Sequence, residues 1–217
     1  MTLRSLALRF AVSMLVAAAA FGATGSGAAE PVRKAQPSKV TTTTEAAPKT
    51  DAANDAAMAE MMKNASPGPM HEKLKSMLGT WKAVVKTWAA PGEPTVTEGT
   101  SVNTLILGGR YVSQDFKGSM MGQPFQGMGL TGYDNRKQEF TSFWVDNSST
   151  AMMTYAGKLN DKGDELVFKG RGEGPHGLPM DYRTVIRIVD ENTHVFSMYA
   201  PTNGKEALWM EITYTRM

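Results

Sequence analysis

The stretch Gly79-Thr80-Trp81 divides the chain into two kinds of pattern. Before it, residues 70–78 place Leu74, Met77 and Leu78 at helical spacing, which predicts a short helix that ends at the glycine. After it, runs rich in β-branched and aromatic residues alternate with turn sequences up to the end of the chain. The motif therefore predicts the point at which helix gives way to sheet, and Thr80 begins the first strand.

Ten strand-like runs follow, and the connections between them are mostly of hairpin length. Short strands with such connections predict an antiparallel sheet in which sequence neighbours pair. Closing that sheet removes the exposed edges that invite aggregation. We therefore expect an all-β fold, an antiparallel up-and-down barrel of about ten strands preceded by a short N-terminal helix, wide enough to hold an internal ligand. The runs are 80–88, 95–107, 110–119, 125–133, 138–146, 150–159, 164–172, 179–189, 193–199 and 207–215.

Residues 1–29 have the pattern of a secretory signal peptide. Arg4 and Arg9 precede an apolar run from Phe10 to Phe21, and small residues up to Ala29 supply a cleavage site. The apolar run is shorter than the roughly 20 residues of a membrane span, so no membrane span is predicted. With no cysteine in the chain, a lipoprotein anchor is excluded; an uncleaved amphipathic anchor is the alternative. The expected location is periplasmic, for a Gram-negative source, or secreted.

The charge of the chain argues against nucleic acid as a partner. The formal net charge of +2 comes from 23 basic and 21 acidic residues, and Arg4 and Arg9 account for the whole excess. Binding to nucleic acid needs a concentrated basic surface, which a neutral mature chain does not predict. The absence of cysteine also means that residues 70–217 must fold by hydrophobic burial without disulfides.

Residues 30–69 differ in composition from both neighbouring segments. They contain no aromatic residue and are rich in Ala, Thr, Lys and Pro, which is typical of a disordered spacer. Residues 51–65 are alanine-rich and predict partial helix, and Ser66-Pro67-Gly68-Pro69 would end any helix there. We therefore expect a signal peptide at 1–29, a disordered or partly helical spacer at 30–69 and a barrel domain at 70–217.

Aromatic residues beside isolated polar groups are the candidates for ligand binding. Trp144 and Asp146 share one face of the fifth run, Trp88 ends the first, and Tyr133 ends the fourth. This combination is typical of a pocket, although ordinary core packing explains it too. The glycines of the fourth run, including Gly127 and Gly129, favour barrel curvature over contact with a ligand.

The histidines and methionines do not indicate a metal site. His71, His176 and His194 are far apart in the chain and lack metal-ligand spacing. His194 shares a strand face with Phe196, so it is a candidate axial ligand for haem, with His176 in reserve and a structural role as the alternative. The 16 methionines favour an adaptable apolar interior over copper binding.

No catalytic residues are predicted from the sequence. The chain has no cysteine, no Gly-x-Ser-x-Gly elbow, and no phosphate-binding glycine loop before a helix. No cofactor is required by the sequence, and haem is the alternative.

Several motifs together resemble the pattern of a bacterial family of unknown function. That family is similar to the calycin barrels, which include lipocalins, fatty-acid-binding proteins and the haem-binding nitrobindins. A Gly-x-Trp at the head of the first strand and a basic residue late in the last one, here Arg216, resemble the lipocalin signature. The resemblance implies that Gly79, Trp81 and Arg216 close one end of the barrel, with Arg216 stacked on the Trp81 ring. The motifs are Gly79-Thr80-Trp81, Trp88-Ala89-Ala90-Pro91-Gly92, Leu107-Gly108-Gly109-Arg110, Met121-Gly122-Gln123-Pro124-Phe125-Gln126-Gly127, Gly132-Tyr133-Asp134 and Glu211-Ile212-Thr213-Tyr214.

Three functional hypotheses follow. The first is a binding module that holds a small apolar or amphipathic molecule inside the barrel. The second is a haem-dependent or other small-molecule enzyme of nitrobindin type, and the third is a structural or assembly module of the cell envelope. The first rests on analogy between folds, so the chemistry of the barrel interior has to decide among them.

Overall fold

The computed structural model describes residues 52–173, 178–202 and 204–217. The predicted signal peptide, most of the predicted spacer and the reserve haem ligand His176 lie outside these residues. The sheet belongs to the compact unit Ala56–Met217.

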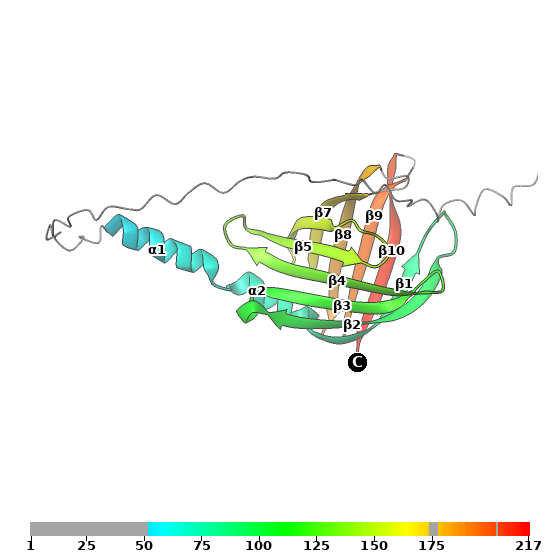
Figure 1. Ribbon diagram of the computed structural model, residues 1–217, viewed down its shortest axis with the longest axis horizontal. Helices are drawn as coiled ribbons and strands as arrows, with labels where there is room; N and C mark the ends of the chain where they lie inside the picture. Colours follow the sequence, from blue (N-terminus) through cyan, green and yellow to red (C-terminus); the bar gives the residue numbers. More distant parts are fainter. Residues whose placement is uncertain (1–51, 174–177, 203) are drawn as a thin grey trace, which may run out of the picture. The chain divides into compact units, whose positions relative to one another are not determined.

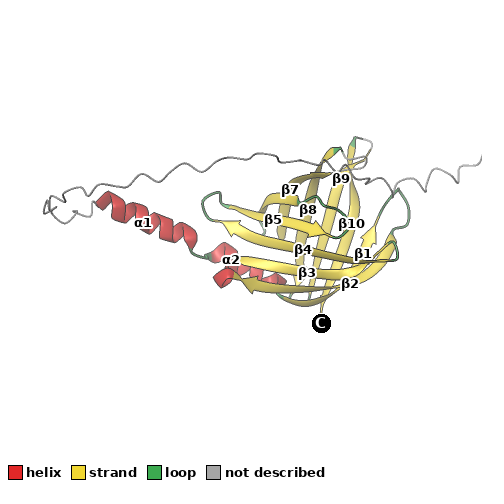
Figure 2. Cartoon of the chain, viewed as in Figure 1, coloured by secondary structure: helices red, strands yellow, loops and turns green. Residues whose placement is uncertain are grey.

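Ten antiparallel strands form one closed barrel in sequence order (Figures 1 and 2). Each strand pairs with the next, and β1 closes the barrel by pairing with β10 from Trp81 opposite Arg216 to Thr87 opposite Met210. The predicted up-and-down barrel is confirmed, and each of the ten predicted runs is a strand. The strands are β1 (Gly79–Thr87), β2 (Thr95–Ile106), β3 (Tyr111–Met120), β4 (Gln123–Asp134), β5 (Glu139–Asp146), β6 (Met153–Leu159), β7 (Glu165–Glu173), β8 (Pro179–Asp190), β9 (Thr193–Thr202) and β10 (Lys205–Arg216).

The helices are short and lie mainly before the first strand. Helix α1 covers Ala52–Ala65, and α2 covers Pro69–Lys73. The 3-10 helix η2 follows directly at Leu74–Met77, and a 3-10 turn, η3, lies at Leu107–Gly109. Among the described residues, no helix has the length and apolar character needed to cross a membrane.

The helix predicted at residues 70–78 differs in detail from the structure. It is a single α-helical turn continued by 3-10 geometry, and it ends at Met77 rather than at Gly79. Gly79 is the first residue of β1 and has a φ of 119°. A Cβ atom at this position would lie 2.5 Å from Nη1 of Arg216. Glycine is therefore needed here by the backbone and by the approach of the guanidinium, not as a helix terminator.

Helix η2 closes one end of the barrel. Leu74 and Met77 are buried against Phe140 and other apolar side chains from the barrel wall. The Met77 carbonyl accepts hydrogen bonds from Trp81 Nε1 at 3.0 Å and from Asn103 Nδ2 at 2.8 Å. These two side chains satisfy a carbonyl that the end of the helix leaves without a backbone partner. We call the end closed by α2 and η2 the capped end.

Large rings on the inner face of the barrel lie over glycines of neighbouring strands. Added to Gly127, a Cβ atom would collide with the Trp144 ring, and at Gly99 it would lie 2.6 Å from the Phe116 ring. The glycines of β4 on the inner face, Gly127 and Gly129, therefore make room for Trp144, whereas the sequence favoured curvature as their role. Because the rings lie along the wall, they line the barrel instead of crossing it.

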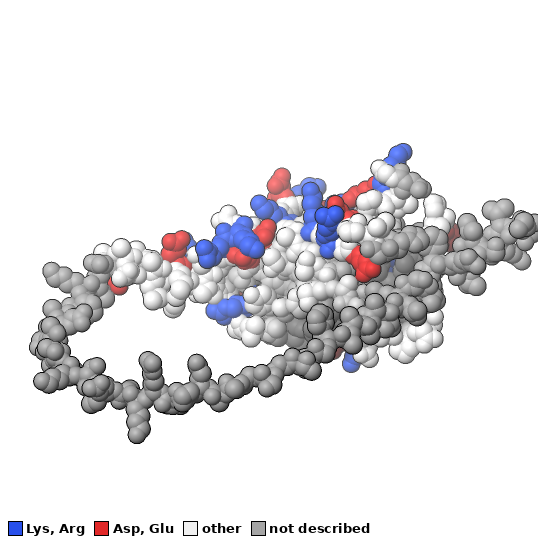
Figure 3. All heavy atoms as spheres, turned by 45° about the horizontal axis from the view of Figure 1, so that its top comes forward, with Lys and Arg blue, Asp and Glu red and all other residues white. Residues whose placement is uncertain are grey.

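Charged residues are interspersed on the outer surface. Figure 3 shows one face of the molecule, where Lys and Arg lie among Asp and Glu without forming a patch of one sign. Ion pairs join neighbouring strands on the outside, such as Lys82 with Glu98 and Arg183 with Glu206. This face offers no basic footprint for nucleic acid.

Candidate functional site

The inner face of the barrel carries both buried and half-buried residues at each end. Trp81 and Phe140 near the capped end are each only 1% exposed. Toward the opposite end, Tyr182, Met198 and Ala200 are buried, whereas other inward-facing residues are half-buried. We call this end, opposite α2 and η2, the mouth. We call the half-buried inward-facing set the chamber: Val85, Phe125, Trp144, Asp146, Met153, Tyr155, Met180, Phe196 and Met210.

The buried residues form three clusters, not one. One cluster surrounds Leu74 at the capped end, a second surrounds Trp81 and Phe116, and a third surrounds Tyr182. A barrel filled with side chains would give one contiguous core. Here half-buried chamber residues such as Tyr155 and Phe196 pack against two clusters each, so the three clusters are connected through the barrel.

Trp144 and Asp146 form the polar edge of the chamber at the mouth. Both lie on the inner face of β5, and Trp144 Nε1 donates a hydrogen bond to Asp146 Oδ2 at 2.8 Å. The other carboxylate oxygen accepts from the backbone N–H and the hydroxyl of Ser148, at 2.9 and 2.6 Å. Asp146 thus fixes both the indole and the loop that follows β5.

Aromatic rings and a phenol surround this pair. The Phe116 ring meets Trp144 edge-on with ring centres 6.4 Å apart, and it meets Phe125 at 5.9 Å. The Tyr155 hydroxyl donates a hydrogen bond to Met153 Sδ at 3.2 Å. Burial, followed by the charges of Tyr182 and Asp146, raises the pKa of the Tyr155 phenol, so this group stays neutral at physiological pH.

A hydrogen-bonded polar cluster lies between the chamber and the capped end. Gln114 Nε2 donates to Ser101 Oγ at 2.9 Å and to the Tyr214 hydroxyl oxygen at 3.3 Å. Ser101 in turn donates to Asn103 Oδ1 at 2.8 Å. Burial raises the pKa of Tyr214 to about 12, with the Gln114 hydrogen bond acting in the opposite direction. All four groups are neutral, and half-buried Gln114 presents the cluster to the chamber.

The four predicted ligand-binding residues divide between the two ends. Trp88 follows β1 at the mouth, where its backbone N–H donates to the Trp209 carbonyl at 2.9 Å. Trp144 and Asp146 lie at the same end. Tyr133 lies at the capped end, packed edge-on against Phe140 with ring centres 4.8 Å apart. The structure therefore separates Tyr133 from the other three and gives it a packing role in the cap.

The predicted closure residues lie together at the capped end. The Arg216 guanidinium carbon lies 4.1 Å from the centre of the Trp81 ring, the stacking that the resemblance implied. Nη1 of Arg216 also donates to the Leu78 carbonyl at 2.7 Å, and Nε donates to the Glu191 carbonyl at 2.9 Å. This one side chain thus ties the end of β10 to the segment before Gly79.

His194 does not fit the role of a haem ligand. Its ring is 4% exposed, stacked on Tyr214 at 4.5 Å and met edge-on by Trp81 at 4.3 Å. Its Nδ1 atom is buried without a hydrogen-bond partner among the described residues. Burial and, secondarily, the charge of Arg216 lower its pKa to about 4. A haem would have to displace the surrounding rings to reach this side chain, so we derive no haem chemistry here.

Several chamber residues were not among those predicted from the sequence. Met153 and Tyr155 both lie on the inner face of β6. Phe125 lies on the inner face of β4, two residues before Gly127. Extending the two-residue alternation from Trp144 to the paired strands would have found them. Across the described residues, no three of His, Cys, Asp and Glu gather as a metal site would require.

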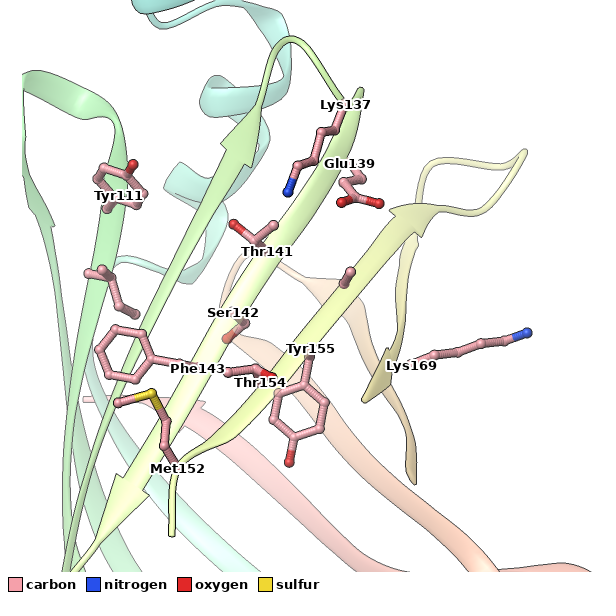
Figure 4. A pocket seen from close by; sticks show the side chains of 12 residues that line it. Tyr111, Lys137, Glu139, Thr141, Ser142, Phe143, Met152, Thr154, Tyr155 and Lys169 are labelled. Carbon is pink, nitrogen blue, oxygen red and sulfur yellow. The ribbon is translucent and has the colours of Figure 1, made fainter. Parts of the chain in front are cut away.

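A second concavity, the outer groove, lies on the outside of the barrel. It has a volume of about 580 Å³ and crosses β3 to β7. Figure 4 shows Phe143 and Met152 close together in it, with Lys137 and Glu139 toward one end. Small-molecule sites normally enclose most of their ligand, and this groove is open to solvent. We therefore take the half-buried inward-facing residues of the chamber as the candidate site.

The fold and the chamber define a lipocalin-like barrel with one closed end. The chain belongs to the family described as "Protein of unknown function (DUF1579)", whose model matches residues 66–216. Among solved structures, the chain is similar to "Crystal Structure of Rv2717c from M. tuberculosis", with 14% identity over 70% of this chain and 99% of that one, and a TM-score of 0.52. At this identity the likeness is one of fold.

A second similar structure is "Structure of S-type Phycobiliprotein Lyase CPES from Guillardia theta". It has 10% identity over 73% of this chain and 97% of that one, with a TM-score of 0.47. Comparison with curated proteins finds no match.

Proposed function

We propose that this chain is an exported binding protein whose barrel holds a small apolar or amphipathic molecule in the chamber. The observation that carries the proposal is the residual exposure of inward-facing aromatic and methionine side chains toward the mouth, such as Phe125, Trp144 and Met153. Covering apolar surface stabilises a complex by about 25 cal/mol for each Å² removed from water. Apolar side chains that remain partly exposed on the inner face would therefore stabilise a complex with a molecule that covers them.

The composition of the chamber suits an occupant of adaptable shape. Met153, Met180 and Met210 are unbranched and polarisable, so they can repack around ligands of different outline. Trp144 is held by Asp146 and by the glycines beneath it, which gives one fixed aromatic surface. A few polar groups beside a mostly apolar lining are the usual composition of a small-molecule site.

Export rests on the sequence of residues 1–29. The expected mature N-terminus follows Ala28 or Ala29. Mass spectrometry of the protein recovered from a periplasmic or culture fraction would measure it. Recovery of the uncleaved chain in the cytosol would contradict export and would leave the binding proposal standing.

Ligand binding can be tested by narrowing the chamber. Thr97 points inward near the mouth, and its neighbour Val96 points outward and is 55% exposed. A neutral fluorescent probe, Nile red, should bind the wild-type protein. Thr97→Trp should weaken its binding by about tenfold, which corresponds to about 1.4 kcal/mol. Val96→Trp, which adds the same group outside the barrel, should leave the affinity unchanged.

The outcomes of this experiment separate the chamber from other surfaces. If both variants weaken the probe equally, or neither does, the probe binds outside the chamber. Failure of the wild-type protein to bind Nile red or any apolar probe would overturn the proposed function. The unfolding temperature of each variant shows that the barrel is intact.

A further inference from the structure

We propose that the chamber prefers cationic amphiphiles, molecules that carry a protonated or quaternary amine on an apolar body, over fatty carboxylates. This inference rests on the proposed function and specifies the ligand class of the same chamber. It follows from which charged side chains lie on the inner face of the barrel and from the groups that surround them.

Asp146 is the one charged side chain on the inner face between the cap and the hairpin tips, among the residues that the structure describes. Its strand register places it on the same face as Trp144 and buried Phe140. Lysines and arginines along the strands point outward, as the ion pairs of Lys86 with Glu211 and Arg183 with Glu206 illustrate.

Two basic residues at the ends of the barrel do not offset the negative charge of Asp146. Arg216 is engaged at the capped end by Trp81 and by three backbone carbonyls. Lys205 lies at the tip of the β9–β10 hairpin and is exposed, where solvent screens its charge. A carboxylate inside the chamber would therefore find no basic partner on the described inner face, and it would lie near Asp146.

The surroundings of Asp146 suit a cation. Its carboxylate accepts three hydrogen bonds, from Trp144 and Ser148, and an ionised carboxylate has about four acceptor positions. Trp144 offers a ring face, and cations are attracted to aromatic faces most strongly at tryptophan. The charge of Asp146 also reaches into the chamber, because it contributes, after burial and Tyr182, to raising the pKa of Tyr155.

The energetic argument is asymmetric. A carboxylate that leaves water for this chamber loses its hydration and gains no opposite charge, which is costly. An ammonium group at the mouth keeps part of its hydration and gains both the Asp146 charge and an aromatic face. A neutral head group should have an affinity between those of the carboxylate and the ammonium group, because Gln114 and the tyrosine hydroxyls can hydrogen-bond to it.

Three probes that share one alkyl chain test this order. Dodecyltrimethylammonium, dodecanol and dodecanoate are titrated against bound Nile red at neutral pH, below their micelle-forming concentrations. The ammonium probe should displace Nile red at about tenfold lower concentration than dodecanol. Dodecanoate should be the weakest competitor. Added salt should reduce the advantage of the ammonium probe and leave dodecanol unchanged.

Asp146→Asn identifies the residue responsible. The variant keeps an oxygen that can accept the Trp144 hydrogen bond and removes the charge. In this variant the ammonium probe should displace Nile red at about the same concentration as dodecanol. Dodecanoate should displace it at a lower concentration than in the wild-type protein. Asp115→Asn, on the exposed outer face of β3, changes the net charge equally and should preserve the wild-type order.

Each outcome decides between the two proposals. If dodecanoate competes as well as the ammonium probe in the wild-type protein, the charge preference is wrong while the binding function stands. The same conclusion follows if Asp146→Asn binds dodecanol normally and keeps the ammonium preference. If none of the probes competes and Nile red itself does not bind, the proposed function fails and this inference fails with it.

Discussion

Trp81 lies where the cap, the first strand and the last strand meet. Its indole N–H donates to the Met77 carbonyl, and Arg216 covers its ring from the end of β10. The ring is 1% exposed and belongs to the cluster that includes Phe116 and Ile212. A single side chain therefore joins closure of the sheet to closure of the barrel end.

Trp81→Ala should lower the free energy of unfolding by roughly 3–5 kcal/mol, as for other large core truncations. The loss combines buried area with the unpaired Met77 carbonyl and the uncovered Arg216. Urea denaturation followed by circular dichroism measures it. Trp88→Ala, at the half-buried mouth position, should cost less. A Trp81→Ala protein of wild-type stability that no longer binds Nile red would instead place Trp81 in the ligand site.

His194 makes the capped end sensitive to acid. Burial, with a smaller effect of Arg216, lowers its pKa to about 4 from the ordinary value of 6.5. As the pH falls from 6.5 toward 4, the unfolded chain takes up a proton at this residue that the folded chain does not. This residue should therefore reduce stability progressively across that window and have no further effect below it.

His194→Phe should remove that pH dependence, because phenylalanine keeps an aromatic ring between Trp81 and Tyr214 without a titrating group. Relative to the variant, the wild-type protein should lose up to about 3 kcal/mol of unfolding free energy between pH 6.5 and pH 4. Urea denaturation of both proteins at several pH values gives the difference, in which other titrating groups cancel. Parallel stability curves for the two proteins would contradict the lowered pKa.

At the scale of elements, turn residues in the sequence predicted where strands occur. They did not predict the residue at which each strand begins or ends. The predicted runs 110–119 and 125–133 leave residues 120–124 for the turn, but β4 already begins at Gln123. The hairpin has only two central residues, Met121 and Gly122, with φ values of 52° and 76°. Positive φ at both positions matches the twist of a tight hairpin, and a methionine there is not a typical signal for it.

Contacts between elements were harder to predict than the elements themselves. Trp144 and Asp146 could be placed on one face because they are two residues apart in one strand. That Gly127 makes room for Trp144 depends on the register between β4 and β5, which neither strand shows alone. The positions of Tyr133 and His194 at the capped end likewise follow from strand direction in the closed sheet.

For the whole molecule, the sequence predicted a barrel wide enough for a ligand but not whether its interior is open. Openness depends on where every inward ring lies, and that position depends on the rotamer of each ring and on the glycine beneath it on the paired strand. That Asp146 is the one charged side chain on the described inner face between the cap and the hairpin tips is similarly a property of ten strands together. It becomes visible only when each charged residue is assigned to the inside or the outside.

The barrel should also be separable from the helix that precedes it. Helix α1 buries none of its residues, and Met58, Met61 and Met62 are each more than half exposed. The hydrogen bonds from Asn135 to the carbonyls of Asn64 and Ser66, and from Arg110 to that of Ala65, join this segment to the connections that precede β5 and β3. Three hydrogen bonds at a surface contribute little to the stability of a domain with its own core.

Removal of residues 1–65 should therefore change the unfolding temperature by no more than about 4 °C, the shift that about 1 kcal/mol produces in a domain of this size. Nile red affinity should be unchanged, because the chamber opens at the mouth and the truncation is at the capped end. Calorimetry and probe titration measure both. Removal of residues 1–78 is the matched comparison: it takes away Leu74 and Met77 and should destabilise the barrel severely. If the shorter truncation is as damaging as the longer one, α1 is an integral part of the barrel fold and not a separable segment.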